Sequence, residues 1–402
     1  MIALRKQKGV TLVELMIALV LGVVLMLGLL EVFASAKQTY RVSEALARVQ
    51  ESGRFATDFL QRDLRMAGHM GCLNDQARAL NNPSTYSTAF VPVSQRMAGV
   101  LDATGNPQLN FHRPVVGYEA SGSGPADTIT FPVSGAWTGA PALEPHISTL
   151  TPQPAAGSDI ISLRYFSPNG IPADFNPTAS ASTSTITVDK ASWDANIATS
   201  GYTNPGLLAL SDCVNAVTFQ ASSVAVSGTK VVITVESSGL NASNLTADAF
   251  TAGQTMLYRA DSSVWYVALN DAAQPGLSLY RARYTAAPGA ASVELLGGAP
   301  EEMVAGVDSI QAMYGVDSET NTAIAPTGYM ATQSVASAAT VWPRVGLIRL
   351  GVLVRSAETT PVQPDDDSLR VIGTRFEIPD TDQRLRSTYE TTIAMRNRLF
   401  GN

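Results

Sequence analysis

One acidic side chain lies inside an apolar stretch near the start of the chain. Glu14 follows Gly9 by five residues in the sequence KQKGVTLVELM, and every residue from Leu15 to Leu30 is apolar or glycine. A charged side chain deep in a membrane helix costs about 2.5–3.5 kcal/mol on insertion scales, and such residues are usually paired and functional. Glu14 therefore either reaches a nearby aqueous interface or has a task that requires its charge.

Cysteine and histidine are the other residue types whose chemistry could matter. The two cysteines, Cys72 and Cys213, are compatible with one disulfide in an oxidising compartment or with two unrelated buried thiols in the cytosol. The three histidines stand in unlike contexts, and surface roles are expected for them: His69, His112 and His146. The sequence has no CxxC, HExxH, GxSxG or P-loop motif, so we predict no catalytic residue and no cofactor.

One acidic segment could be considered for metal binding. Asp317, Glu319 and Asn321 place oxygen ligands at alternate positions, as at the start of a calcium loop. The glycine and the distal glutamate of such a loop are missing, so an ordinary polar turn is the preferred interpretation and we predict no metal site. The net charge of −7, with no basic cluster beyond the first residues, also argues against nucleic acid as a direct partner.

The apolar stretch itself has three interpretations. With its tail to Ala34 it is about 25 residues long, enough to cross a hydrocarbon core of about 30 Å. Basic residues precede it, so the N-terminus is expected in the cytoplasm. A secretory signal is one interpretation, because an A-x-A pattern ends at Ala36 and cleavage there would release a soluble protein. An uncleaved anchor is another, but it leaves Glu14 without a task.

The third interpretation accounts for every feature. The stretch GVTLVE resembles the type IV prepilin signal, in which a short basic leader ends in glycine. The resemblance implies that a membrane-embedded prepilin peptidase cuts between Gly9 and Val10 and that the new N-terminus on Val10 is methylated. It also implies that Glu14, as the fifth mature residue, pairs with the Val10 amine of a neighbouring subunit and favours the correct register in assembly. The family more often has phenylalanine where this chain has Val10.

A long helix must position these residues. Apolar or small residues recur at steps of three or four from Val42 to Ala67, with charges on the other side, and Gly68 and Gly71 bracket the expected end. We predict one helix over 10–67, roughly 87 Å long at 1.5 Å per residue. Three glycines would allow local bending: Gly22, Gly28 and Gly53.

The sequence pattern of the rest of the chain predicts a β-rich head. Charged residues make up only 15 % of the sequence, and after Cys72 short alternating runs are separated by polar loops. Strands are predicted at 128–133, 159–166, 185–189, 214–221, 230–236, 256–259, 264–269, 277–284, 310–316, 347–355 and 371–377, with a last strand in TYETTIAMRNRL. Long surface loops are predicted at 80–126, 136–158 and 317–343, and a short helix or turn at 300–310.

These elements predict an α+β, pilin-like fold. A long N-terminal helix, transmembrane and then amphipathic, packs on a globular head of antiparallel sheets. The expected divisions are a leader peptide at 1–9, the membrane or filament-core half of the helix at 10–34, its amphipathic half at 35–71, and a periplasmic or extracellular head at 72–402.

Motifs across the head narrow the resemblance to the minor pilins of the PilW type. They are GCLN at Cys72, SDIISLRYF at 158–166, LLALSDCVNAVTF at 207–219, VAGVDSIQAMYGVD at 304–317, LIRLGVLVRS at 347–356 and YETTIAMRNRL at 389–399. The resemblance implies a disulfide between Cys72 and Cys213 that ties the end of the helix to the sheet.

The same resemblance implies a function in assembly, with no enzymatic activity. After processing, the protein would prime polymerisation of a type IV pilus within a complex of minor pilins at the tip, with the major pilin as a further partner. It would span the inner membrane once, with the head in the periplasm, and then join the pilus at the cell surface, where twitching motility and cell adhesion belong to the whole pilus. The alternatives are a minor pseudopilin of a type II secretion system and a secreted adhesin or enzyme cleaved after Ala36.

Overall fold

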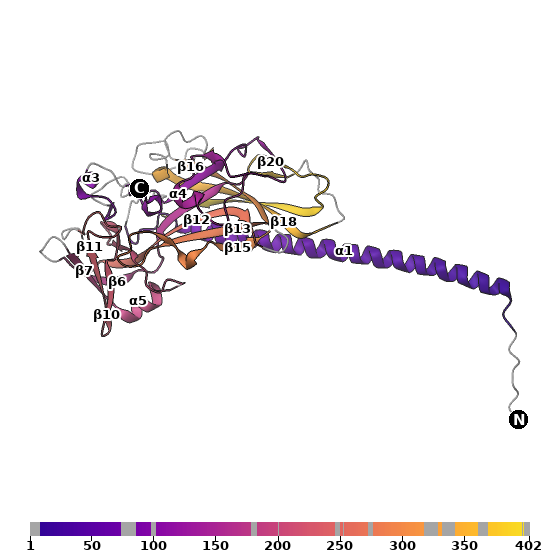
Figure 1. The fold of residues 1–402 in the computed structure, drawn as a ribbon, viewed down its shortest axis with the longest axis horizontal. Helices are drawn as coiled ribbons and strands as arrows, with labels where there is room; N and C mark the ends of the chain where they lie inside the picture. Colours follow the sequence, from indigo (N-terminus) through magenta and orange to yellow (C-terminus); the bar gives the residue numbers. More distant parts are fainter. Residues whose placement is uncertain are drawn as a thin grey trace, which may run out of the picture.

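A long helix projecting from a β-rich head dominates the computed structural model (Figure 1). The structure describes residues 9–73, 86–97, 102–177, 183–199, 201–245, 250–251, 253–271, 276–316, 329–331, 342–360, 369–395 and 397. The helix, α1, runs over Leu12–Met66, slightly shorter than predicted. The predicted α+β fold, a long N-terminal helix packed on a β-rich head, is confirmed. The calcium-like segment around Asp317 and most of the predicted loop 317–343 lie outside the described residues.

The two halves of α1 have different surroundings. Large apolar side chains from Val10 to Phe33 are exposed, whereas the second half buries one stripe against the head: Ala45, Val49, Gly53, Ala56, Leu60, Asp63 and Leu64. This is the stripe that the spacing predicts, except that Leu46 stays exposed and the acidic Asp63 is buried. The buried stripe and the facing sheets share one apolar core, which fixes the position of the helix.

Gly53 has a role that the sequence analysis missed. The helix continues without a break through Gly22, Gly28 and Gly53. A Cβ atom on Gly22 or Gly28 would have no heavy atom within 4 Å, but one on Gly53 would lie 2.1 Å from Cε2 of Tyr389. The hydroxyl of Tyr389 donates to the Val49 carbonyl oxygen at 3.4 Å. Gly53 is therefore a notch for the Tyr389 ring.

Polar contacts hold the last turns of α1. The Asp63 carboxylate is buried and accepts a hydrogen bond from Trp265 Nε1 at 3.1 Å, with Arg281 Nη1 at 3.5 Å. Burial raises the pKa of Asp63, while the positive charge of Arg281 and the indole hydrogen bond oppose that rise. Asn397 Nδ2 donates to the Arg65 carbonyl oxygen at 3.0 Å, near the end of the chain.

The larger part of the head is a 14-stranded sheet. Its strands are β1 (Tyr86–Thr88), β2 (Val115–Ala120), β4 (Gly139–Ala140), β5 (Ile160–Phe166), β6 (Ile171–Pro177), β7 (Thr183–Asp189), β8 (Leu207–Ser211), β9 (Ala216–Gln220), β10 (Ser223–Ser227), β11 (Lys230–Glu236), β12 (Met256–Leu269), β13 (Leu277–Thr285), β14 (Glu294–Leu295) and β15 (Glu301–Ala305). The long strand β12 pairs with β5, β6, β8 and β13, so it joins the parts of this sheet.

Two smaller sheets complete the head. One has the order β17–β16–β18–β21, with bounds Tyr329–Ala331, Val307–Val316, Val345–Thr359 and Arg384–Ala394. The other has the order β19–β20–β3, with bounds Arg370–Val371, Thr374–Glu377 and Thr128–Thr130. The helix α1 lies against β21, β18, β15 and β5. Pairing is antiparallel as predicted, except that β1–β9 and β20–β3 are parallel.

Short helices fill the connections between strands. They are α3 (Val93–Met97), α4 (Pro145–Ser148) and α5 (Lys190–Asn196), with 3-10 turns η1 (Pro107–Leu109), η3 (Leu296–Gly298) and η5 (Trp342–Arg344). Asp189 caps α5 by accepting from the Ser192 backbone N–H at 3.0 Å.

Several sequence predictions are wrong in detail. The predicted loop 80–126 contains the fully buried strand β2, whose sequence VVGYEA does not alternate. The segment 300–310 is not helical: β15 turns into β16 at Gly306, where φ is +80°. The predicted strands 256–259 and 264–269 are one strand, β12, which continues through the polar residues Asp261, Ser262 and Ser263. Strands β6, β8 and β10 were not predicted.

Candidate functional site

The segment predicted to be processed lies just before α1. Gly9 and Val10 are exposed and outside the helix, and a Cβ on Gly9 would meet no heavy atom within 4 Å. Thr11 is the N-cap of α1, with extended backbone angles of φ −77° and ψ 153°. The link between Gly9 and Val10 is therefore accessible, as an enzyme that binds extended peptide would need.

Glu14 has a partner within its own chain. The Thr11 backbone N–H and the Thr11 hydroxyl each donate to Glu14 Oε2 at 2.9 Å, and the Glu14 backbone N–H donates to Thr11 Oγ1 at 3.4 Å. These reciprocal bonds form a capping box, which satisfies backbone donors at the helix start. This role of Glu14 was not predicted, although the T-x-x-E spacing is its signature.

The first half of α1 presents apolar side chains all round. Large apolar residues between Val10 and Phe33 are more than half exposed. Within the described residues α1 is the one helix long and apolar enough to cross a membrane, judged by length and composition. An apolar helix this exposed needs lipid or other apolar helices around it.

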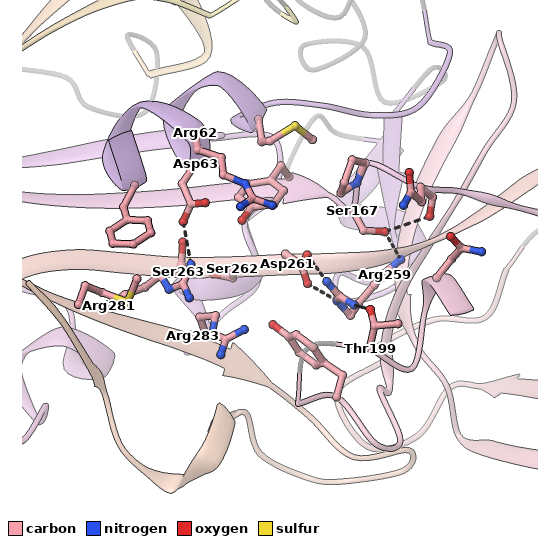
Figure 2. Close-up of a pocket in the computed structure, with 18 residues that line it drawn as sticks. Arg62, Asp63, Ser167, Thr199, Arg259, Asp261, Ser262, Ser263, Arg281 and Arg283 are labelled. Carbon is pink, nitrogen blue, oxygen red and sulfur yellow. Dashed lines mark hydrogen bonds and ion pairs between the residues drawn. The ribbon is translucent and has the colours of Figure 1, made fainter. Parts of the chain in front are cut away.

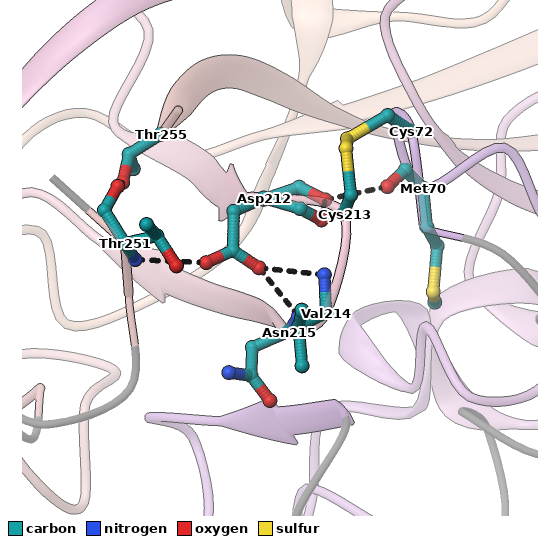
Figure 3. Close-up of a disulfide and its surroundings, with 9 residues drawn as sticks. Met70, Cys72, Asp212, Cys213, Val214, Asn215, Thr251 and Thr255 are labelled. Atoms are coloured by element: carbon teal, nitrogen blue, oxygen red, sulfur yellow. Dashed lines mark hydrogen bonds between the residues drawn. A yellow bond between two sulfur atoms is a disulfide. The ribbon is translucent and has the colours of Figure 1, made fainter. Parts of the chain in front are cut away.

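The second feature with chemistry is the junction between the helix end and the sheet (Figure 3). Cys72 and Cys213 form a disulfide with their Cα atoms 4.9 Å apart, so the predicted pairing is confirmed. The neighbouring Ser211 hydroxyl donates to the Met70 carbonyl oxygen at 2.7 Å. Two bonds, one covalent, therefore connect the chain after α1 to the end of β8.

Asp212 shapes the turn that carries Cys213. Its Oδ1 accepts hydrogen bonds from the backbone N–H groups of Val214 and Asn215 at 2.8 and 2.6 Å. Its Oδ2 accepts from the Thr251 backbone N–H at 2.9 Å, which attaches the turn to the chain before β12 (Figure 3). The three residues of the SDC motif thus have separate roles. Ser211 bonds to the chain after α1, Asp212 stabilises the turn, and Cys213 forms the disulfide.

The three histidines do not lie on the surface as predicted. His112 is buried with Nε2 2.9 Å from Asp102 Oδ1, and burial lowers the pKa of its imidazole. Burial and the nearby charge of Arg164 lower the pKa of His146 to about 3. His69 is half-buried, with Nδ1 3.0 Å from the Phe166 carbonyl oxygen. Among the described residues no group of three or more His, Cys, Asp or Glu side chains could hold a metal ion.

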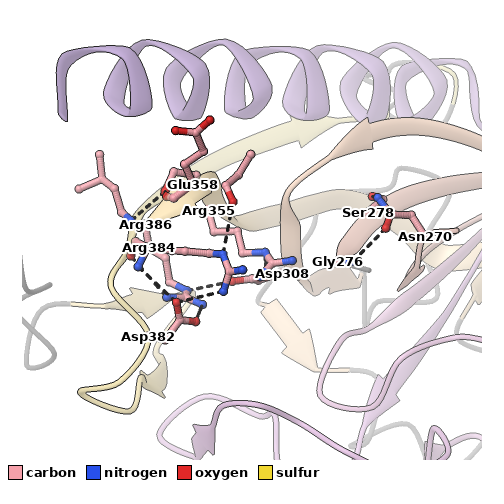
Figure 4. A network of polar contacts seen from close by, with 12 residues as sticks. Asn270, Gly276, Ser278, Asp308, Arg355, Glu358, Asp382, Arg384 and Arg386 are labelled. Atoms are coloured by element: carbon pink, nitrogen blue, oxygen red, sulfur yellow. Dashed lines mark hydrogen bonds and ion pairs between the residues drawn. The ribbon is translucent and has the colours of Figure 1, made fainter. Parts of the chain in front are cut away.

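A charged network fixes the C-terminal strand beneath the helix (Figure 4). Asp308 on β16 is buried and accepts from Arg386 Nε of β21 at 2.8 Å, while Arg355 Nε of β18 lies 3.0 Å from its other oxygen. Arg386 also reaches Asp382 at 2.7 Å. Because each buried charge has an opposite charge beside it, this network holds β16, β18 and β21 in register.

Two family models match the chain. Residues 264–397 match the model described as type IV pilus-assembly protein W, PilW, and residues 4–30 match the prokaryotic N-terminal methylation motif. Over 264–397 this chain is similar to pilus-assembly proteins of the PilW type. A type IV-like pilin from Thermus thermophilus shares 12 % identity with it, over 35 % of this chain and 70 % of that chain, with a TM-score of 0.19, which supports no further conclusion. No curated protein matches it.

The residues that match the PilW model are also the residues that hold α1 against the head. It begins within β12 and includes β13, β16, β18 and β21. Trp265 and Arg281 contact Asp63, Tyr389 fills the notch at Gly53, and Asn397 contacts the last turn of α1. The residues similar to PilW thus hold the second half of α1 against the head, while the residues that match the methylation motif include the start of the helix.

Proposed function

We propose that this protein is a PilW-type minor pilin that takes part in type IV pilus assembly and is not an enzyme. The observation that supports this best is the exposed apolar half of α1, which follows directly on an accessible Gly9–Val10 link. Before assembly this half spans the inner membrane with the head in the periplasm. After cleavage it packs among the helices of other minor pilins and the major pilin.

A position at the pilus tip, in a complex that primes polymerisation, is the finer part of the proposal. The head contains three sheets and extends beyond the helix on several sides (Figure 1). Such bulk is tolerated best where no further subunit must stack above it. In vivo crosslinking from the head should capture other minor pilins, whereas exclusive capture of secretion pseudopilins would overturn the pilus assignment.

Processing gives the first testable prediction. N-terminal sequencing of the protein from membranes should find a methylated Val10 as first residue, because Gly9 and Val10 are exposed ahead of α1. A start at Lys37 would contradict the proposal. The structure supports the first outcome, since Ala34, Ser35 and Ala36 lie within the continuous helix, which would have to unwind for cleavage after Ala36.

Glu14 gives the second prediction. The proposal is that its charge pairs with the Val10 amine of a neighbour, in addition to its bonds with Thr11. Glu14→Gln keeps a capping box, because glutamine serves at that position as well, but it removes the charge. We expect both Glu14→Ala and Glu14→Gln to be processed normally and to enter sheared pili at about a tenth of the wild-type level. This tenfold loss corresponds to ~1.4 kcal/mol of binding free energy, because the Val10 amine of the neighbour is left without its opposite charge.

The pair of variants separates the two roles of Glu14. Wild-type incorporation of Glu14→Gln with poor incorporation of Glu14→Ala would show that the cap matters and the charge does not. Normal incorporation of both would show that Glu14 only reaches the membrane interface. Thr11→Val, which removes the capping hydroxyl and keeps the acid, is the matched control and should enter pili better than Glu14→Gln.

A further inference from the structure

A polar pocket of about 620 Å³ lies between the last turns of α1 and the face of β12 and β13 (Figure 2). This volume is within the usual range of ligand pockets, about 300–1,000 Å³. Arg62 and Asp63 reach toward it from the helix, and Asp261 and Ser263 from β12. It belongs neither to the apolar stem nor to the disulfide junction, and the proposed assembly function does not use it.

The floor of the pocket is built from alternate residues of β12. Arg259, Asp261 and Ser263 share one face of the strand, and Trp265, next on that face, contacts Asp63 of α1. Arg259 and Asp261 form a two-bond ion pair, with Nε–Oδ1 at 2.6 Å and Nη2–Oδ2 at 2.9 Å. This pair is buried, so the floor is rigid and its geometry is set before any ligand arrives.

Three buried donors in the pocket lack a partner among the described residues. They are the hydroxyls of Ser262 and Ser263, on residues that are 1 % and 3 % exposed, and Arg281 Nε. Arg281 lies opposite Trp265, the next residue after Ser263 on the same face of β12, so a hydroxyl and a guanidinium are neighbours on this face. Buried donors are nearly always paired in folded proteins, and three that line one pocket indicate an acceptor that binds here.

The residue types in the lining indicate that the acceptor is negative. The pocket is lined by four arginines: Arg62, Arg259, Arg281 and Arg283. Three carboxylates are near them: Asp63, Asp261 and, at the margin, Glu301, which lies 3.0 Å from Arg281 and 3.4 Å from Arg283. Each of these carboxylates already has an arginine beside it, so none of them is the acceptor that Arg281 Nε and the serine hydroxyls lack. Arginine beside a hydroxyl suits a carboxylate, which accepts several hydrogen bonds in one plane.

Other residues of the lining offer groups suited to hydroxyls. Asn169, Asn196 and Thr199 line the pocket, and Asn196 Nδ2 already donates to the Ser192 carbonyl oxygen at 3.1 Å, which orients its amide. Phe59 of α1 adds an apolar surface at the edge. We propose that this pocket binds a hydroxylated carboxylate, an acidic sugar unit of the uronate class, with its carboxylate at Ser263 and Arg281 and its hydroxyls toward Asn169 and Asn196.

Calorimetric titration of the full chain in detergent tests this proposal with D-glucuronate as the probe. We expect saturable binding of glucuronate and at least tenfold weaker binding of D-glucose, which lacks the carboxylate, and of acetate, which lacks the hydroxyls. Ser263→Ala should lower the affinity for glucuronate about tenfold, the loss of one hydrogen bond to a charged group. Its melting temperature should not fall, because the hydroxyl has no partner in the part of the chain that the structure describes.

Ser162→Ala is the matched control. The Ser162 hydroxyl is also buried without a partner among the described residues, but Ser162 lies on β5 and does not line the pocket. It should leave glucuronate binding unchanged. No heat with glucuronate would overturn the proposal, as would an equal loss with Ser162→Ala and Ser263→Ala. Acetate binding as tight as glucuronate binding would reduce the pocket to a simple anion site and overturn the sugar assignment. None of these results depends on whether the chain enters pili.

Discussion

Gly53→Leu is expected to loosen the head from its helix. Leucine is a good helix former, so propensity alone would stabilise α1 by about 1 kcal/mol relative to glycine. In the protein the new side chain meets Tyr389, since a Cβ on Gly53 would lie only 2.1 Å from the ring. Overpacking of this kind costs about 1–3 kcal/mol, and the Tyr389 contact with Val49 is lost as well. Urea unfolding should therefore show a net loss of about 2 kcal/mol.

The chain supplies matched controls for this experiment. Gly22→Leu and Gly28→Leu lie in the same helix with nothing within 4 Å of the added Cβ, and they should not lower the unfolding midpoint. Tyr389→Ala opens the space, so Gly53→Leu should cost less in that background than in the wild type. Equal costs in both backgrounds would show that the ring does not set the requirement for glycine at position 53.

Loss of the Cys72–Cys213 disulfide is expected to have the largest effect on stability. The two residues are separated by 141 positions, and the chain-entropy relation gives about 5 kcal/mol for a loop of that length. The double variant Cys72→Ser with Cys213→Ser should unfold at much lower urea concentration than the oxidised protein. The double variant avoids a free thiol that could form a bond with another molecule.

Two measurements make this prediction specific. Reduced wild-type protein should unfold like the double serine variant, because both lack the same bond. Asp212→Asn leaves the disulfide in place and weakens the turn that carries Cys213, so its loss should be much smaller. A double variant as stable as the oxidised wild type would contradict this prediction. It would show that the non-covalent contacts of α1 with the head are sufficient for stability without the disulfide.

The sequence predicted the features that depend on local periodicity. The helix, its buried stripe and most alternating strands follow from spacing alone, because one face of each element is apolar. The disulfide followed from the family resemblance. The T-x-x-E capping box at Thr11 was also readable from the sequence and was missed. The role of Gly53 was not readable, because Tyr389 is far away in sequence and only the folded chain brings the two together.

The prediction failed most clearly where polar residues interrupt a pattern. Two strands were predicted in place of β12, with a break that includes Asp261, Ser262 and Ser263, since three polar residues in a row are typical of a loop. In the structure the strand continues, and Asp261 and Ser263 form the floor of the pocket beside α1. Local patterns fail where a fold holds polar groups for a purpose, so this failure itself marks the pocket as a candidate site. Strand β2 was missed for a related reason, because both of its faces are buried.

The attachment of the helix to the head also determines how the protein responds to pulling. In the proposed pilus, tension loads α1 along its axis, and the contacts at Gly53, Asp63 and Asn397 resist sliding of the helix along the head. Past Met66, only six residues of chain lead to Cys72 and its bond with Cys213. If these contacts break, the six residues allow the end of α1 and the head to separate by about 20 Å before covalent bonds carry the force. The helix can then slip out of these contacts and return without the head being lost.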